Sequence, residues 1–449
     1  MKRLSLIIAA VLLAHAGFGD VFKDGETVCF LGDSITHGGR FHSLIYDYYL
    51  TRFPDRTVRF VNAGVSGDSA GGALGRLTED VIDKKPTSVA IMFGMNDVNR
   101  GCYVTDPDAQ KRAAQTGALN SYRSNMEKLV GRIRSEGGDP RLLFITPSPF
   151  DQTAVNDRNN NQPGCNDGLG KCATLVRELA GKNNATVVDF HSPMTAFNLE
   201  RQKSDPSYTI VGPDRIHPGA AGHLMMAWLF LRSQGAPALV SKVTVDVAKL
   251  HITECENATV SDFATKDGIW SFTLLEKSLP FPVDDAAKPL LAALPIEREL
   301  NQETVAATGL SSGSYELLID GAVTGRYTAE ELAKGVNLAF NAASPQVKQA
   351  QAVAKLNETR RSTECVLRNY AAVRWFLKHR QVNPDDLAAV TTFAETKMSK
   401  TGFYEGMVAN YVENWSKRSD VAAKVASIEQ ALFIARKPVS HVYVLRPVH

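Results

Sequence analysis

The feature that most constrains the fold is an alternation, up to about residue 235, between short apolar runs and longer amphipathic stretches. The apolar runs are Val28–Leu31, Val58–Asn62, Val89–Phe93, Leu142–Ile145 and Thr186–Asp189. The stretches that we expect to be helical are Phe41–Arg52, Ala73–Lys84, Leu119–Ser135, Cys172–Lys182 and Gly219–Leu231. Strands that are apolar throughout and separated by helices indicate a parallel sheet covered on both faces. The sequence therefore predicts a doubly wound α/β domain, which binds ligands beyond the carboxyl ends of its strands.

The chain beyond residue 235 has a different pattern. Segments predicted to be β-strands are Ile269–Leu275, Tyr315–Ile319 and the final His441–Leu445, with a turn at Asp320-Gly321. Residues 328–435 are predicted to be helical, beginning at the capped start Thr328-Ala329-Glu330-Glu331. Because no long linker is present, we expect one domain at 22–235 and, at 236–449, a β-strand and helical region packed on it.

The N-terminus has the layout of a secretory signal peptide. Lys2 and Arg3 precede the apolar run Leu4–Leu13, and Ala14-His15-Ala16 offers a small-x-small cleavage site. The run is too short to span a bilayer, so we expect residues 1–16 to be removed and the mature protein to be soluble, periplasmic or secreted.

The net charge and the cysteines exclude some classes of partner. Without Lys2 and Arg3 the chain has 48 basic and 48 acidic side chains, which gives no electrostatic footprint for nucleic acid. Of six cysteines, only Cys165 and Cys172 lie close together in the sequence, and they suit either a disulfide or two buried thiols. No spacing resembles a zinc site, so no metal is predicted. The sequence does not predict an oligomeric state.

Polar segments follow the predicted strands at the edge where a ligand would bind. They are Gly32-Asp33-Ser34, Asn62-Ala63-Gly64-Val65-Ser66-Gly67-Asp68, Gly94-Met95-Asn96-Asp97 and, just before the last helix of this half, Asp214-Arg215-Ile216-His217-Pro218. Attack on an ester needs a nucleophile, a base, a group that orients the base, and donors for the oxyanion. These segments contain side chains of each kind.

Ser34 stands at a strand-to-helix turn and is the candidate nucleophile. His217 can act as its base, and Asp214, three residues earlier, can hold the tautomer of the same imidazole. The backbone N–H groups of Ser34 and Gly67 and the side-chain amide of Asn96 are candidate oxyanion donors. Gly67 suits this role because a residue without Cβ lets the backbone approach a ligand closely.

These four segments, in this order, resemble the conserved blocks of the SGNH hydrolases, also called GDSL esterases. Residue by residue, the resemblance makes Ser34 the nucleophile, Gly67 and Asn96 oxyanion donors, and Asp214 with His217 the acid–base pair. It covers roughly residues 25–232, and the first block has Ile35 where the family has Leu. The family implies a flavodoxin-like three-layer sheet and hydrolysis of esters, thioesters or glycan O-acetyl groups without a cofactor.

A looser resemblance predicts the substrate. Gly32–Arg40 and Phe93–Arg100 are similar to exported bacterial members with a long C-terminal extension, among them carbohydrate O-acetylesterases. We therefore expect an esterase acting on small acyl groups, chiefly acetyl, of carbohydrates. Alternatives are a lipid or acyl-thioester hydrolase and, in another class, a non-catalytic carbohydrate-binding protein. Asn156–Asn166 would suit sugar hydroxyls, although we favour a flexible surface loop.

A rival nucleophile is Ser69, since Gly67-Asp68-Ser69-Ala70-Gly71 satisfies the G-x-S-x-G pattern after a strand. The same pattern recurs at Gly309–Gly313 in a predicted β region, which shows how little it specifies. With Ser69 as nucleophile, the blocks at Ser34 and Asn96 would have no role. We therefore favour Ser69 as the residue that starts the next helix.

Other polar residues near the candidate site have less certain roles. His37 and Arg40 are possible substrate contacts, and they suit a helix entry with a solvated arginine equally well. Asp33 and Asp97 are expected to brace turns. His223, inside the last helix of the domain, is expected to be structural.

Overall fold

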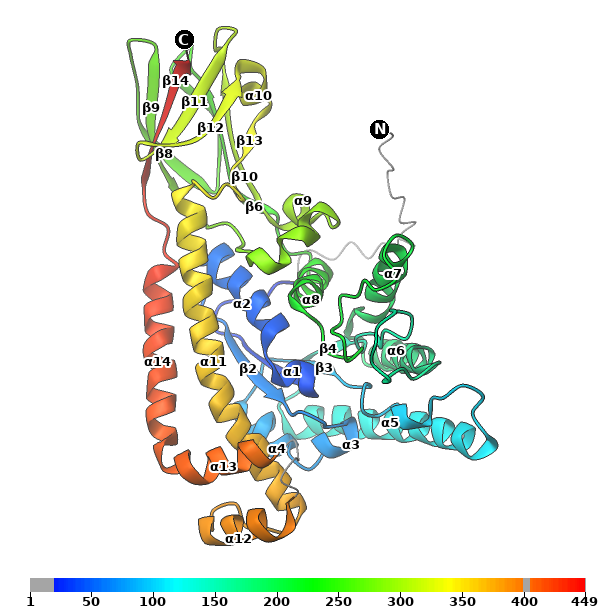
Figure 1. The fold of residues 1–449 in the computed structure, drawn as a ribbon. Helices are drawn as coiled ribbons and strands as arrows, with labels where there is room; N and C mark the ends of the chain where they lie inside the picture. Colours follow the sequence, from blue (N-terminus) through cyan, green and yellow to red (C-terminus); the bar gives the residue numbers. More distant parts are fainter. Residues whose placement is uncertain (1–19, 399–403, 449) are drawn as a thin grey trace.

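The computed structural model describes residues 20–398 and 404–448, so the predicted signal peptide at 1–16 lies outside the described residues. The α/β domain, residues 20–235, is built on five parallel strands in the order β2-β1-β3-β4-β5 (Figure 1). Their bounds are β1 Thr27–Gly32, β2 Arg59–Gly64, β3 Ser88–Met92, β4 Arg141–Ile145 and β5 Thr186–Val188. This order is that of the flavodoxin-like doubly wound fold and confirms the predicted fold class.

Helices cover both faces of this sheet. They are α1 Ser34–His37, α2 Arg40–Arg52, α3 Ala70–Ala73, α4 Leu77–Asp80, η1 Ile82–Lys84, η2 Arg100–Cys102, α5 Ala109–Glu136, α6 Cys165–Lys182, α7 His191–Gln202 and α8 Ala220–Ser233. Phe30 and Met92 point into a core shared with α2 and α8, whereas Leu31 and Ile91 point into a second core with α5 and α6. Side chains alternate between the two faces because the period of a strand is two residues.

The structure corrects two expectations in this domain. Ala73–Lys84, predicted as one helix, is divided into α3, α4 and η1. Glycines at 71, 72 and 75 weaken a helix here, and Arg76 turns its buried guanidinium toward the carbonyls of Gly32 and Ala63. The helix α7 was not expected.

Cys165 and Cys172 are both free, buried thiols. They lie two turns apart on α6, about 10 Å along the axis, which is beyond the Cα separation of a disulfide. Among residues 20–398 and 404–448, no helix is long and apolar enough to cross a membrane.

The chain continues into a β-sandwich at the top of Figure 1. Its sheets have the orders β13-β10-β6-β7 and β12-β11-β14-β9-β8. The strands are β6 Leu239–Asp246, β7 His251–Glu256, β8 Ala258–Lys266, β9 Ile269–Glu276, β10 Gln302–Thr308, β11 Ser314–Ile319, β12 Ala322–Thr328, β13 Val336–Asn337 and β14 His441–Val448. Between β9 and β10 lie η3 Asp285–Ala292 and α9 Ile296–Leu300. The last strand, β14, pairs with both β11 and β9, so the sandwich is completed only by the end of the described chain.

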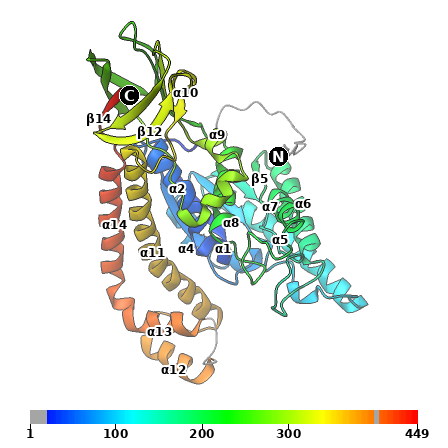
Figure 2. The same cartoon turned by 45° about the horizontal axis from the view of Figure 1, so that its top comes forward.

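A helical arm, residues 345–435, leaves the sandwich and returns to it (Figures 1 and 2). It comprises α11 Pro345–His379, α12 Leu387–Lys397, α13 Glu405–Asn414, η4 Trp415–Lys417 and α14 Arg418–Ala435. Thr328 and Glu331 form the predicted capping box, but the helix they start, α10 Ala329–Lys334, is short. It ends at Gly335, whose φ of 88° is unfavourable for other residues, and the chain forms β13 before α11 begins. The expectation of continuous helix over 328–435 was therefore wrong in its first part.

The arm packs along the α/β domain rather than extending into solvent. Ala350 and Val353 of α11 and Leu432 of α14 belong to the same core as Phe30. The buried Asn357 donates hydrogen bonds to the carboxylate of Asp47 at 2.8 Å and to the carbonyl of Ser43 at 3.0 Å. The two halves thus share one hydrophobic core on this face of the sheet.

Candidate active site

Ser34 is the first residue of α1, directly after β1. The carboxylate of Asp33 caps this helix by accepting a hydrogen bond from the Ile35 N–H at 3.1 Å. Asp33 is buried, and burial raises the pKa of its carboxyl to about 6. Helix α1 packs tightly against β2, since a Cβ on Gly64 would lie 2.2 Å from the His37 nitrogen. This packing fixes the position of the Ser34 hydroxyl at the carboxyl end of the sheet.

His217 lies beside Ser34 on the loop before α8. The Ser34 Oγ and His217 Nε2 are 2.8 Å apart, and His217 Nδ1 lies 2.5 Å from Asp214 Oδ2. The other Asp214 oxygen accepts the backbone N–H groups of Ile216 and His217 at 3.1 and 3.0 Å. Burial opposes ionisation of Asp214, but these hydrogen bonds outweigh it and hold its pKa below the ordinary value. An ionised Asp214 accepts the Nδ1 proton, so Nε2 is free to accept the serine proton.

The loop that carries Asp214 and His217 is held by Arg215. Its buried guanidinium donates to the carbonyls of Asp151 and Ala154, both at 2.8 Å, and to the side chain of Asn160 at 3.0 Å. Its φ of 69° is unusual for a residue with a side chain and persists because these bonds fix it. Asn160 comes from the Asn-rich segment Asn156–Asn166, so one function of that segment is to support this loop.

Gly67 and Asn96 lie with Ser34 and His217 around one pocket of about 600 Å³. A Cβ on Gly67 would meet no atom within 4 Å, and the residue has a φ of 76°. Glycine is therefore required here by the left-handed conformation of the turn rather than by crowding. The Asn96 amide donates one hydrogen to the carbonyl of Asp68 at 2.8 Å, which leaves its second N–H for a ligand.

Asp97 connects the turns that carry these two residues. Its carboxylate accepts the N–H of Gly94 at 3.1 Å and the N–H of Ala70 at 2.9 Å, so it braces the turn as expected. Burial raises the pKa of Asp97 to about 7. Ser69 is occupied as the cap of α3, where its Oγ accepts the Gly72 N–H at 3.2 Å.

The helical arm forms one wall of the pocket, which the sequence did not lead us to expect. Cys365 and Asn369 of α11, with Tyr404 and Met407 at α13, line it opposite Ile216 and His217. The Tyr404 hydroxyl donates to the carbonyl of Ser66 at 3.0 Å, next to Gly67. The arm therefore shapes the space in front of Ser34 and also supports the turn of a candidate oxyanion donor.

A buried ion network joins the same turn to α11. Arg76 contacts the carboxylates of Asp68 at 2.7 Å and Asp80 at 2.8 Å, and Arg368 of α11 binds both oxygens of Asp80. Burial opposes ionisation of Asp80, but the two guanidinium groups hold its pKa well below its ordinary value. Removing one member of a buried ionic group leaves an uncompensated charge, so this network ties the arm to the turn that precedes Ser69.

The remaining predicted residues lie at different places. His37 lines the same pocket, and its Nδ1 accepts the backbone N–H of Ser66 at 3.1 Å. Burial lowers the pKa of His37 to about 4, so its imidazole is neutral. Arg40 does not line this pocket but a second cavity, together with the buried His223. The structure thus brings Ser34, Asp214, His217, Gly67, Asn96 and His37 together and separates Arg40 from them.

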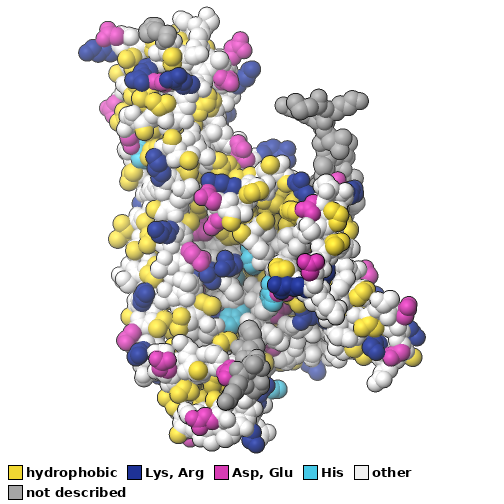
Figure 3. All heavy atoms as spheres, in the orientation of Figure 1, with side chains coloured by type: hydrophobic (Ala, Val, Ile, Leu, Met, Phe, Trp, Pro, Cys, Tyr) yellow, Lys and Arg dark blue, Asp and Glu magenta, His cyan; other side chains and the backbone are white. Residues whose placement is uncertain are grey.

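In Figure 3, histidine side chains lie between the helical arm and the α/β domain, flanked by basic and acidic groups. Among the described residues, no group of three or more His, Cys, Asp or Glu side chains is placed to hold a metal ion. The arrangement at Ser34 is suited to nucleophilic attack by a serine with a histidine base.

Comparisons with known proteins show which families and structures this chain resembles. The model of the GDSL-like lipase/acylhydrolase family matches residues 30–225. A solved structure of a gut microbial diltiazem-metabolizing enzyme is 31% identical and superposes with a TM-score of 0.87, covering 96% of this chain and 99% of that one. Acetylxylan esterase of Geobacillus stearothermophilus is 27% identical over 226 residues, 47% of this chain and 94% of its own. Esterase TesA of Pseudomonas aeruginosa is 32% identical over 91 residues, 20% of this chain and 38% of its own.

Proposed function

Because this chain belongs to the GDSL-like lipase/acylhydrolase family and is a carboxylic ester hydrolase, we propose that it removes small acyl groups, chiefly acetyl, from carbohydrates. The proposal rests mainly on two contacts, one between Ser34 and His217 and the other between His217 and Asp214. Its substrate class is supported by the acetylxylan esterase relative. Export through the predicted signal peptide is part of the same proposal.

In the proposed mechanism, the Ser34 Oγ attacks the acyl carbonyl while His217 Nε2 takes its proton. Asp214 stabilises the imidazolium that forms. The negative oxygen of the tetrahedral intermediate is bound by the backbone N–H groups of Ser34 and Gly67 and by the free N–H of Asn96. His217 then protonates the leaving alcohol, and water, deprotonated by the same histidine, releases the acyl group from Ser34.

A Ser34→Ala variant tests the nucleophile. We expect it to lose p-nitrophenyl acetate hydrolysis by about 10⁴-fold or more, because the rest of the triad has no nucleophile to activate. Ser69→Ala is the matched control: it removes a helix cap, which costs about 1 kcal/mol of stability, and should retain activity. Undiminished cleavage by Ser34→Ala, or loss of activity in Ser69→Ala alone, would refute the assignment.

The substrate class is tested with two series of esters. Released acetate should be detected from acetylated xylo-oligosaccharides, and p-nitrophenyl acetate should react faster than the octanoyl ester. A much faster octanoyl ester would favour the alternative of a lipid or thioester hydrolase. If the wild type cleaves no ester, the protein is instead a non-catalytic binding protein.

A further inference from the structure

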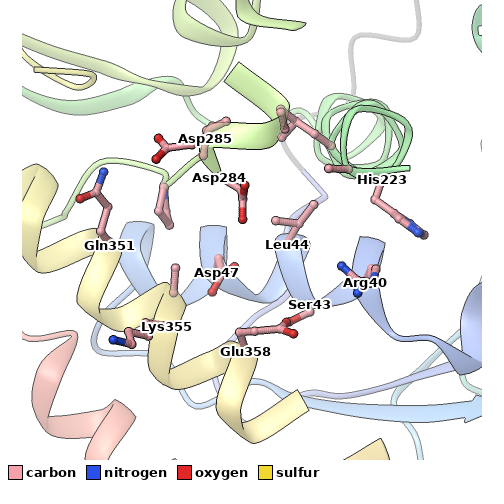
Figure 4. Close-up of a pocket in the computed structure, with 16 residues that line it drawn as sticks. Arg40, Ser43, Leu44, Asp47, His223, Asp284, Asp285, Gln351, Lys355 and Glu358 are labelled. Carbon is pink, nitrogen blue, oxygen red and sulfur yellow. The ribbon is translucent and has the colours of Figure 1, made fainter. Parts of the chain in front are cut away.

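A second cavity of about 490 Å³ lies beside the pocket of Ser34 and has no role in the mechanism above. Figure 4 shows that its walls come from four elements: α2, α8, the segment leading into η3, and α11. Two of these, η3 and α11, lie outside residues 30–225, which the family model matches. The cavity is therefore formed by the C-terminal half packed on the α/β domain, and its size is within the range of small-ligand sites.

The chemistry of its lining suits a ligand that both donates and accepts hydrogen bonds. The acidic side chains are Asp47, Asp284, Asp285 and Glu358, and the basic and amide side chains are Arg40, Lys355 and Gln351. Four acidic and two basic groups line the same space, so an anionic ligand is disfavoured, whereas neutral hydroxyl groups find both donors and acceptors. Leu44, Leu224 and Val283 add apolar surface between them. Hydroxyl groups act as donor and acceptor, and a sugar ring presents many hydroxyls together with apolar C–H faces.

Two of the lining groups are buried polar side chains with unused hydrogen-bonding capacity. Asp47 is 6% exposed, and one of its oxygens accepts the Asn357 amide. His223 is 7% exposed, and its Nδ1 has no hydrogen-bond partner among the described residues. Because this nitrogen is itself buried, a ligand in the cavity cannot reach it, and Asp47 is the buried polar group that is available to one. Arg40, Gln351 and Lys355, in contrast, reach the cavity from its exposed rim.

Three elements continue from this cavity into the pocket of Ser34. On α11, Glu358 lines the cavity and Cys365 lines the pocket; they are two turns, or about 10 Å, apart on one face of the helix. Arg40 follows Gly38 by two residues, and Ala220 follows His217 by three. Between the two spaces lies Arg361, whose guanidinium donates to the Gly38 carbonyl at 2.8 Å and pairs with Glu358.

We propose that the second cavity is a subsite for sugar residues on the alcohol side of the ester. This inference rests on the proposed function and extends it, because it assigns the recognition of the leaving glycan to the C-terminal half. A chain of sugars bound there runs past Arg361 and presents one acetylated hydroxyl to Ser34. Arg40, predicted as a substrate contact, then contacts the distal sugar rather than the acyl group.

Filling the cavity tests this subsite. Ala354 lines it on α11, so Ala354→Trp should occupy the space of a sugar ring. We expect kcat/KM on acetylated xylo-oligosaccharides to fall about tenfold, mainly through KM, with hydrolysis of p-nitrophenyl acetate unchanged. The matched control is Ala352→Trp, on the same helix but exposed and outside the cavity, which should leave both rates unchanged.

A second variant avoids any effect on packing. The double variant Gln351→Ala with Lys355→Ala removes two exposed side chains of the rim and should raise KM for the oligosaccharide in the same way. On the Ser34→Ala background, calorimetric titration with acetylated xylo-oligosaccharide should show binding that Ala354→Trp weakens about tenfold.

The outcomes separate this inference from the proposed function. If the wild type cleaves p-nitrophenyl acetate and oligosaccharides but both cavity variants keep the wild-type ratio of rates, the subsite is refuted and the esterase stands. Cleavage of p-nitrophenyl acetate without cleavage of any acetylated oligosaccharide also refutes the subsite. No cleavage of any ester refutes the proposed function itself.

Discussion

The α/β domain and the helical arm contribute to the site of Ser34 in different ways. The α/β domain holds Ser34, His217 and Asp214 on turns at the end of its parallel sheet, with contacts of 2.5 to 3.0 Å between them. The arm supplies the opposite wall, with Cys365, Asn369 and Met407. The comparison suggests that the reaction depends on one region and the choice of substrate on the other.

The two regions are nevertheless joined so that neither is independent of the other. They share a hydrophobic core, and Arg368 of the arm binds Asp80 within the buried ion network of the α/β domain. A change at this junction therefore affects both stability and the turn that carries Gly67. Substitutions in each region test how far the reaction and the choice of substrate can be separated, and the substitution with the largest expected effect comes first.

Asp214→Asn should have the largest effect and should act on the reaction alone. An amide at this position donates where the carboxylate accepts, which disfavours the His217 tautomer that leaves Nε2 free, so we expect kcat to fall by about 10⁴-fold. Steady-state hydrolysis of p-nitrophenyl acetate measures this. Asp205→Asn, in an exposed turn where Asp205 accepts from Ser207, should keep kcat near the wild-type value. A loss of less than tenfold in Asp214→Asn would mean that Asp214 does not orient the base.

Arg368→Met should lower the stability of the contact between the helical arm and the α/β domain more than any other substitution considered. It leaves Asp80 with only one of its two guanidinium partners in a buried site, and we expect a loss of about 3 kcal/mol in the free energy of unfolding. Because the network holds Asp68 next to Gly67, kcat should also fall. Chemical denaturation and ester hydrolysis measure the two effects.

The control for this variant lies on the same two helices, α11 and α4. Lys378 of α11 pairs with Glu79, but both side chains are about half exposed. Lys378→Met should therefore cost less than about 1 kcal/mol and leave kcat unchanged. If the two variants lose the same amount of unfolding free energy, the buried network is not what stabilises this contact.

Much of the α/β domain could be predicted from the sequence because its signals are local. Each strand is apolar throughout, since both faces are covered, and each block of candidate catalytic residues directly follows a strand or precedes a helix. The break at Arg76 was missed because it depends on a guanidinium bonded to distant carbonyls of β1 and β2.

The contribution of the arm could not be predicted in the same way. Cys365 and Asn369 follow Ser34 by more than 300 residues and belong to no short motif. Their position depends on the path of α11, which is fixed by Asn357, Arg368 and a core shared with the other half. The separation of Arg40 from the Ser34 pocket is likewise a result of tertiary packing, because its sequence position is only two residues from Gly38.

Met407→Ala should change the selectivity for the length of the acyl group without changing the reacting groups. It therefore tests whether the arm controls the choice of substrate. Shortening this wall enlarges the pocket, and we expect the rate on butyryl relative to acetyl esters to rise by up to about tenfold, the effect of one or two methylenes. Rates on p-nitrophenyl esters of increasing length measure it. Met398→Ala, a control in the apolar cluster of the arm but outside the pocket, should leave the ratio unchanged. An unchanged ratio in Met407→Ala would mean that Met407 does not contact the acyl group.

Glu303→Gln should have the smallest effect and should change how the stability of the β-sandwich depends on pH. Glu303 is fully buried in β10, and neither carboxylate oxygen has a hydrogen-bond partner among the described residues. Burial, and then the neighbouring Glu276, raises the pKa of Glu303 well above its ordinary value; burial also raises the pKa of Glu276 to about 7. A carboxyl whose pKa is higher in the folded than in the unfolded protein stabilises the fold at low pH. That stability is lost as the pH rises through the folded-state pKa.

The free energy of unfolding of the wild type should therefore fall between about pH 5 and 8, and that of Glu303→Gln should fall by about 1 kcal/mol less. The remaining slope in the variant belongs to the other buried carboxyls with raised pKa, which the substitution leaves in place: Glu276, Asp97, Asp47 and Asp33. Glu256→Gln, an exposed carboxylate of β7, is the control and should reproduce the wild-type slope. Parallel curves for the wild type and Glu303→Gln would show that Glu303 does not titrate in this range, and the pH sensitivity would then be assigned to the other buried carboxyls.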